Sequence, residues 1–207
     1  MKCKFFGFTI ILLFCVSGLY AQLGIKAGVN IANELNTYRI SDMKVGLKST
    51  NLTGYQIGLV YQCMPKKSGF GFEIGALLSQ KGSTFNDSTH TGYRELNYLE
   101  VPLNLRYRLT LGFIGVYGFG GMYGGYELSG KTVDEVTNNI KTITYSSFTN
   151  HVDYGYNFGA GIELFKKIQL GATLSQGLKN TSTTTVGLPI PTKTTNRVYS
   201  VNLVYMF

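Results

Sequence analysis

The chain has 207 residues, among them 26 glycines, 15 tyrosines and 13 phenylalanines, and only 14% of its residues are charged. The formal net charge of +8 is scattered rather than gathered into a basic stripe, which argues against a nucleic-acid partner. This composition favours β-structure, and no segment after residue 21 is long and apolar enough for a membrane-spanning helix. If the chain enters a membrane, it must therefore do so as a closed barrel.

Residues 1–21 have the pattern of a secretory signal peptide. Two lysines precede an apolar run over residues 5–16, and small or weakly polar residues lead to an expected cleavage site after Ala21. Cys15 raises the alternative of a lipoprotein, but the bulky residue before it argues against lipid attachment. We therefore expect an exported protein that loses these residues.

The predicted mature chain, residues 22–207, has the length of a single domain and shows strand-like alternation along most of its length. Eight segments place apolar residues on one face and polar residues or glycine on the other. In chain order these segments are residues 23–32, 54–63, 70–81, 96–109, 113–128, 154–165, 168–177 and 197–207. In the segment 113–128 bulky residues fall on both faces, and a β-bulge near Gly120 and Gly121 is predicted to reconcile them.

Short and long connections alternate between the eight predicted strands. Three connections are tight turns, whereas four gaps are long and polar: residues 33–53, 82–93, 129–153 and 178–196. This alternation is typical of an up-and-down barrel whose termini lie at the end with the short turns. We therefore predict an all-β fold, an eight-stranded antiparallel transmembrane β-barrel of the small OmpA/OmpX-like kind. The expected location is the outer membrane, with the termini and short turns in the periplasm and the long loops outside.

The segment 96–109, LNYLEVPLNLRYRL, indicates which surroundings the strands require. Its apolar residues alternate with charged residues, an asparagine and a proline. Lipid on one side and a polar interior on the other satisfy both faces. The predicted interior network consists of Lys26, Glu73, Lys81, Glu100, Asn104, Arg106, Arg108, Asn157 and Glu163. Because both charge signs are present, we expect ion pairs between neighbouring strands.

Pro102 lies in the middle of this segment and has no sheet edge to occupy in a closed barrel, so we expect a local irregularity there. The alternative fold is a soluble β-sandwich or lipocalin-like barrel with the apolar face inside. That arrangement would place repeated glycines on the solvent-exposed face, where they weaken strands without an evident gain.

Aromatic residues gather near the short turns and at the end of the chain. We expect them to form a girdle on the periplasmic side: Tyr61, Phe70, Phe72, Tyr107, Phe113, Phe165, Tyr205 and Phe207. Tyr205 and Phe207 on the last strand resemble the signal that the outer-membrane barrel-insertion machinery reads. The expected partners are thus outer-membrane lipid and, during assembly, that machinery.

Several stretches resemble one known family. They are LGIKAGVNIANEL (23–35), IGALLSQKGS (74–83), LNYLEVPLNLRYRL (96–109), YGYNFGAGIEL (154–164) and NRVYSVNLVYMF (196–207). Together they look like the PorT-type outer-membrane β-barrel family of Bacteroidota. The resemblance implies a small eight-stranded barrel and a link of the founding member to protein secretion across the outer membrane. It supplies no catalytic motif.

The residues themselves do not predict an enzyme, a cofactor site or a metal site. His90 and His151 fall in predicted loops without the spacing of metal ligands. A catalytic set of His151, Asp153 and the serines at 146–147 is conceivable, but polar loop residues are normally just solvated.

Two function classes therefore remain open. Eight strands leave an interior just wide enough for side chains, which disfavours a porin. We predict a structural or interaction barrel that contacts an envelope or secretion partner through its loops or turns. The alternative is a barrel that acts on or binds a lipid or other ligand. Within the gap 129–153, the stretch KTITYSS is predicted to extend the wall as a hairpin and to offer a strand edge for binding.

Overall fold

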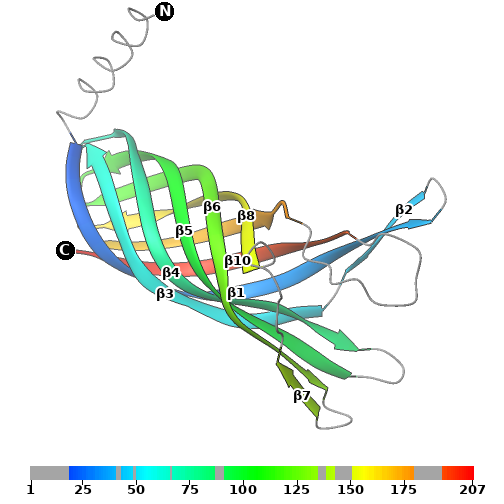
Figure 1. The fold of residues 1–207 in the computed structure, drawn as a ribbon. Helices are drawn as coiled ribbons and strands as arrows, with labels where there is room; N and C mark the ends of the chain where they lie inside the picture. The colour runs from blue at the N-terminus through cyan, green and yellow to red at the C-terminus, as the bar shows by residue number, and fades with distance from the viewer. Residues whose placement is uncertain are drawn as a thin grey trace, which may run out of the picture.

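Eight long antiparallel strands close into a barrel in the computed structural model, which describes residues 19–40, 43–48, 50–65, 67–86, 91–134, 139–142, 151–179 and 193–207 (Figure 1). The barrel strands are β1 (Leu19–Ile40), β3 (Thr50–Pro65), β4 (Gly69–Asn86), β5 (Thr91–Leu111), β6 (Ile114–Asp134), β8 (Val152–Leu164), β9 (Ile168–Gly177) and β10 (Lys193–Met206). Two short strands, β2 (Met43–Lys48) and β7 (Asn139–Thr142), pair with β1 and β6. Within the described residues, no helix has the length and apolar character of a membrane span.

Each barrel strand pairs with the next barrel strand along the chain, and the pairing of β1 with β10 closes the wall. The seam begins where Gly24 lies opposite Met206. Beside it, the amide of Phe207 donates a hydrogen bond to the carbonyl of Leu23 at 2.9 Å. Closure pairs backbone groups that lipid cannot solvate. The predicted eight-stranded antiparallel barrel is confirmed.

Short connections join β3 to β4, β5 to β6 and β8 to β9. They lie at the end of the barrel where β1 begins and β10 finishes (Figure 1). In the β8–β9 turn, Phe165 and Lys166 have positive φ angles of 54° and 58°. Two consecutive positive φ values are the feature of a type I′ turn, whose twist matches that of the flanking strands. The turns and the strand ends therefore lie together, as the alternation of gap lengths predicts.

At the opposite end the strands run well past their predicted boundaries. β5 and β6 each have 21 residues, about twice the number that a tilted strand needs to cross a bilayer. The four gaps interpreted as loops are therefore partly strand, and they contain all of β2 and β7. The extensions carry polar residues on both faces, so their sequence has too little contrast for alternation to reveal them.

The predicted β-bulge at Gly120 and Gly121 is wrong. β6 keeps one register with both of its neighbours through this stretch. Its register with β5 shifts farther from the turns, between Asn97 and Tyr98. The bulky residues on both faces of β6 have another cause, because some of its aromatic side chains point into the barrel.

Pro102 interrupts the pairing of β4 with β5 without a bulge. Ile74 lies opposite Leu103 and Leu77 opposite Glu100, so the register is unchanged across a gap that contains Pro102. Proline lacks the amide hydrogen that a ladder bond requires. The expected irregularity is thus a local loss of pairing.

Apolar side chains cover the outer wall, and polar side chains dominate the inside. On β5, for example, Leu103 is 53% exposed and the adjacent Asn104 only 2%. A small apolar cluster also lies inside the barrel, formed by Val60, Leu77, Val204 and Met206. A soluble barrel would need the reverse arrangement, since so large an exposed apolar surface requires a cover. The outer wall therefore has the character of a surface that faces lipid.

Candidate functional site

The nine residues predicted to face inward are all buried inside the barrel. They come from β1, β4, β5 and β8. Six of them make ion pairs, and Asn104 joins one of these pairs through a hydrogen bond. The other two, Lys26 and Asn157, line a cavity. The structure therefore brings these residues together in two groups with a cavity between them.

The first group lies toward the short turns and is here called the turn-side cluster. Its members are Gln62, Glu73, Asn104, Arg106, Arg108, Glu163 and Gln169. Arg106 pairs with Glu73 on the neighbouring strand. Arg108 pairs with Glu163 at 2.8 Å, although β6 separates their strands in the wall. Charges buried in this way are tolerated because each has an opposite charge and further hydrogen bonds.

Two glutamines that sequence reasoning did not single out connect the pairs of this cluster. Gln62 donates a hydrogen bond to Glu73 at 2.6 Å, and Gln169 donates one to Glu163 at 2.8 Å. The two side chains also exchange hydrogen bonds of 3.0 and 2.9 Å. Both residues lie on the inward parity of their strands, and that parity is the signal that points to them.

The second group lies toward the strand extensions and is here called the ribbon-side cluster. It consists of Lys81, Glu100, Tyr123 and Asp153. The Lys81 ammonium group lies 2.5 Å from Glu100 and 3.4 Å from Asp153. The Tyr123 hydroxyl donates to Asp153 at 3.2 Å, and the ammonium group lies 4.4 Å from the centre of the Tyr123 ring. One cation therefore ties together β4, β5, β6 and β8.

Asp153 corrects the sequence interpretation, which placed this residue in a loop. β8 begins at Val152 and turns Asp153 into the barrel. The alternation of Asp153, Gly155 and Asn157 along one face of the strand is the signal that points to it.

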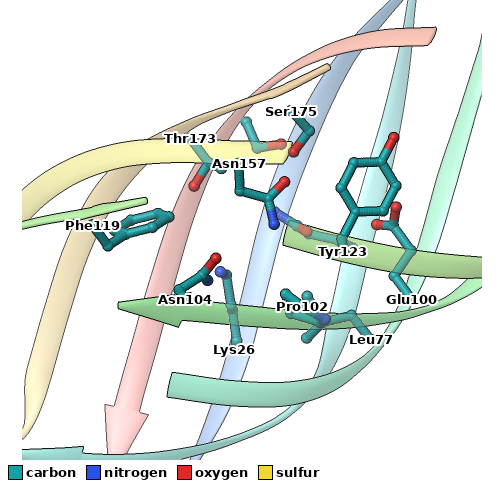
Figure 2. A pocket seen from close by; sticks show the side chains of 12 residues that line it. Lys26, Leu77, Glu100, Pro102, Asn104, Phe119, Tyr123, Asn157, Thr173 and Ser175 are labelled. Atoms are coloured by element: carbon teal, nitrogen blue, oxygen red, sulfur yellow. The ribbon is translucent and has the colours of Figure 1, made fainter. Parts of the chain in front are cut away.

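A cavity of about 20 Å³ lies between the two clusters. Figure 2 shows side chains that line it. Lys26, Asn104 and Asn157 reach it from three different strands. The side-chain oxygens of Asn104 and Asn157 have no hydrogen-bond partner among the described residues. A cavity of this size holds a single water molecule, which is the partner these oxygens require. Side chains therefore fill the interior around this cavity, as eight strands predict.

Lys26 is a further buried cation, between the two clusters. The turn-side cluster contains two guanidinium groups and two carboxylates, whereas the ribbon-side cluster contains one ammonium group and two carboxylates. Lys26 lies between them, where its ammonium group is close enough to interact electrostatically with Glu73 of one cluster and Glu100 of the other. A buried ammonium group without this countercharge would be costly.

Glycines on β8 and β9 make room for aromatic side chains that β6 sends into the barrel. A Cβ atom on Gly171 would meet the hydroxyl of Tyr117, and one on Gly155 would lie 2.7 Å from the ring of Tyr123. Tyr117 in turn packs against Arg106, whose guanidinium carbon lies 4.1 Å from the ring centre. The inward glycines therefore serve the packing of these rings.

His151 lies against the backbone and an aromatic ring of β6. The Nδ1 atom of His151 lies 3.2 Å from the carbonyl oxygen of Glu127, whereas Asp153 belongs to the ribbon-side cluster. The serines at 146–147 and His90 lie outside the described residues. In the described ranges, no three His, Cys, Asp or Glu side chains gather as metal ligands.

The aromatic residues near the turns form an exposed girdle on the outer wall. All eight residues of the predicted girdle are exposed. Three pairs of their rings lie in contact: Phe70 with Tyr107, Phe113 with Phe165, and Tyr205 with Phe207. Barrels carry such rings at the membrane–water interface.

Comparisons with known proteins agree with this architecture. The model of the family described as "Outer membrane protein beta-barrel domain" matches residues 16–183. The outer membrane protein OprG from Pseudomonas aeruginosa superposes with a TM-score of 0.51 at 15% identity, over 91% of this chain and 97% of OprG. At this identity the likeness shows the fold alone.

Two further solved structures resemble the chain more loosely. Neisserial surface protein A has a TM-score of 0.44 at 8% identity, over 91% of this chain and 99% of that one. The outer membrane enzyme PagL has a TM-score of 0.43 at 10% identity, over 85% of this chain and 98% of that one. No curated protein matches the sequence.

Proposed function

Because the chain belongs to the outer membrane protein β-barrel family, we propose that it works as an interaction module rather than as a channel or an enzyme. The barrel anchors the chain in the outer membrane. The strand extensions at the end opposite the turns bind a protein partner.

These extensions are here called the ribbons: β2 with the end of β1, and β7 with the end of β6 (Figure 1). On the outer wall of β6 the last large exposed apolar residue is Leu128. Just beyond it, Lys131 pairs with Glu95 of β5 at 3.0 Å. The hydrogen bond to Glu95 raises the pKa of Lys131 above its ordinary value. Exposed charges here indicate that the ribbons stand in water.

The free edge of β7 carries the proposal. In the described part of the chain, β7 (Asn139–Thr142) pairs with β6 alone. An edge strand presents backbone donors and acceptors to which an extended segment of another protein can add. The pairing also extends the barrel wall as a hairpin over part of the gap 129–153. Of the stretch KTITYSS, β7 contains Lys141 and Thr142, whereas residues 143–147 lie outside the described residues.

The barrel interior supports a role without transport. The cavity has the size of one water molecule, and ion pairs occupy the clusters on both sides of it. Asp153, one member of the conceivable catalytic set, is held by Lys81 and Tyr123. Both observations favour binding outside the membrane over chemistry or conduction inside it.

We place the turns and the chain ends in the periplasm and the ribbons outside the cell, after cleavage behind Ala21. The barrel-insertion machinery then reads Tyr205 and Phe207 during assembly, and outer-membrane lipid surrounds the wall. The resemblance to PorT-type barrels of Bacteroidota supports a partner in protein secretion or surface assembly.

Photocrosslinking in living cells tests the proposal. A photoreactive amino acid at Ile140 on β7 should capture a protein, and deletion of residues 139–142 should abolish capture by a probe at Lys131. The matched control is a probe at Leu128, on the apolar wall, which should capture lipid only. A second probe at Lys67, in a short turn, reports on the periplasmic side. Adducts from Ile140 with lipid and assembly factors alone would contradict an interaction module that binds through its ribbons.

A further inference from the structure

A groove of about 410 Å³ opens on the outer wall, where β8, β9, β10 and β1 follow one another. Ala160 and Ala172 face each other across β8 and β9 and form its floor. Bulkier side chains surround the floor, among them Phe158, Leu174 and Tyr199. Small residues between large ones leave a depression in a wall that otherwise presents bulky apolar side chains to lipid.

The positively charged side chain of Arg197 lies beyond one end of the groove. Tyr199 of β10 lies opposite Leu174 of β9, and two residues farther toward the ribbons Arg197 lies opposite Gln176. Two residues along a strand correspond to about 7 Å. On these two strands, Arg197 is therefore the charged side chain nearest to the ribbon end of the groove.

The guanidinium group of Arg197 is only partly engaged. Its Nε atom donates a hydrogen bond to the side-chain oxygen of Gln176 at 2.7 Å. Among the described residues, its two terminal amino groups have no hydrogen-bond partner and no ion pair. A guanidinium group fixed at Nε presents these two groups as a fork, which suits a phosphate.

We propose that the groove and Arg197 form a binding site for one phosphorylated, acylated glycolipid of the outer leaflet. An acyl chain lies over Ala160 and Ala172, and a phosphate of the headgroup binds Arg197. The choice of a glycolipid rests on the proposed orientation, because Arg197 lies at the ribbon end of the wall. A phospholipid of the inner leaflet would instead place its phosphate at the turn end, near Lys166 and Lys167.

Charge and burial favour this occupant over a purely apolar one. The groove alone accepts any acyl chain, so it supplies affinity without choice of headgroup. An Arg–phosphate contact at the edge of the hydrocarbon region is stronger than one in water, because the surrounding dielectric constant is lower. Selection of a phosphorylated headgroup should therefore depend on Arg197, and binding of the acyl chain should depend on the alanine floor.

The test uses the full barrel in nanodiscs of phosphatidylcholine that contain a small fraction of lipid A. The barrel is recovered in mild detergent, and bound lipid A is measured by mass spectrometry. One variant fills the groove, Ala160→Leu with Ala172→Leu, and another removes the charge, Arg197→Gln. The matched controls are Ala76→Leu, on the outer wall of β4, and Lys131→Gln. All variants change outward-facing positions, and heat-dependent gel mobility verifies that each has folded.

We expect wild-type protein to retain a single lipid A molecule, and filling the groove to lower this retention roughly tenfold. Arg197→Gln should lower retention of lipid A by a similar factor but leave retention of dephosphorylated lipid A unchanged. The two controls should behave like wild type. Equal retention by the groove-filling variant, or a preference of wild type for phosphatidylglycerol, would overturn the proposal. Neither result affects crosslinking from β7, so failure of this site can be distinguished from failure of the interaction function.

Discussion

Replacing Arg106 with methionine should lower the free energy of unfolding by about 3–5 kcal/mol, the range for a buried ion pair that loses one partner. The methionine keeps much of the volume but leaves the Glu73 carboxylate buried without its nearest cation. It also removes the contact of the guanidinium group with the Tyr117 ring. The chain contains no tryptophan, so urea unfolding in detergent micelles is best followed by circular dichroism.

A double substitution separates the lost ion pair from lost packing. Glu73→Gln in the Arg106→Met background removes the orphaned charge and keeps one side-chain oxygen, which can accept a hydrogen bond from Gln62 or from Asn104. It should restore most of the lost stability, because a buried pair removed on both sides is often nearly neutral. Lys131→Met, which breaks the exposed pair with Glu95, should change stability little. Equal effects of Arg106→Met and Lys131→Met would contradict a turn-side cluster that holds the barrel together.

Replacing Gly171 with alanine should destabilise the barrel by about 1–3 kcal/mol through overpacking. The added methyl group would occupy the space of the Tyr117 hydroxyl. Tyr117 has little freedom to withdraw, because Gly161 on β8 also lies close against its ring. The same unfolding assay measures the loss.

Two comparisons make this prediction specific to the packing of the ring. In a Tyr117→Phe background, which lacks the hydroxyl, Gly171→Ala should cost clearly less than it does alone. Gly124→Ala on the outer wall of β6, where nothing lies within 4 Å, should be neutral or slightly stabilising. If Gly171→Ala and Gly124→Ala have the same effect, the inward glycines do not serve to make room for the rings.

The sequence was most informative where lipid and the polar interior lie on opposite sides of a strand. Along 96–109 each step of one residue changes the environment completely, so alternation predicts both the strand and the inward position of Asn104, Arg106 and Arg108. The same contrast identifies the other barrel strands. It is lost beyond the membrane, where both faces of β5 and β6 meet water, and the strand extensions were therefore interpreted as loops.

Contacts across the interior could not be predicted from alternation. A strand pattern tells which face a side chain occupies but not which strand it meets on the far side of the barrel. The pair Arg108–Glu163 joins strands that are not neighbours. The inward orientation of the aromatic residues of β6 could not be predicted for a related reason. Tyr117 and Phe119 resemble lipid-facing residues until the glycines of β8 and β9 are placed against them.

The distribution of chemistry over the molecule explains why the proposed functions lie at its surface. Charged and aromatic side chains of the described residues pack in the interior, and the cavity between the two clusters has room for one water molecule. Among the described residues, the proposed recognition features are the edge of β7 and the groove that ends at Arg197. Both proposed binding sites therefore lie outside the barrel interior.

The central claim, that the polar face points inward and the apolar face meets lipid, can be tested without any substitution. Nuclear Overhauser effects between lipid acyl protons and methyl groups compare identical residue types on the two faces. We expect contacts for Leu103, Leu105 and Val201, which are exposed on the outer wall, and none for Leu77 and Val204, which are buried inside. Acyl contacts to Leu77 and Val204, with none to Leu103, would contradict this account and indicate a barrel with its apolar face inside.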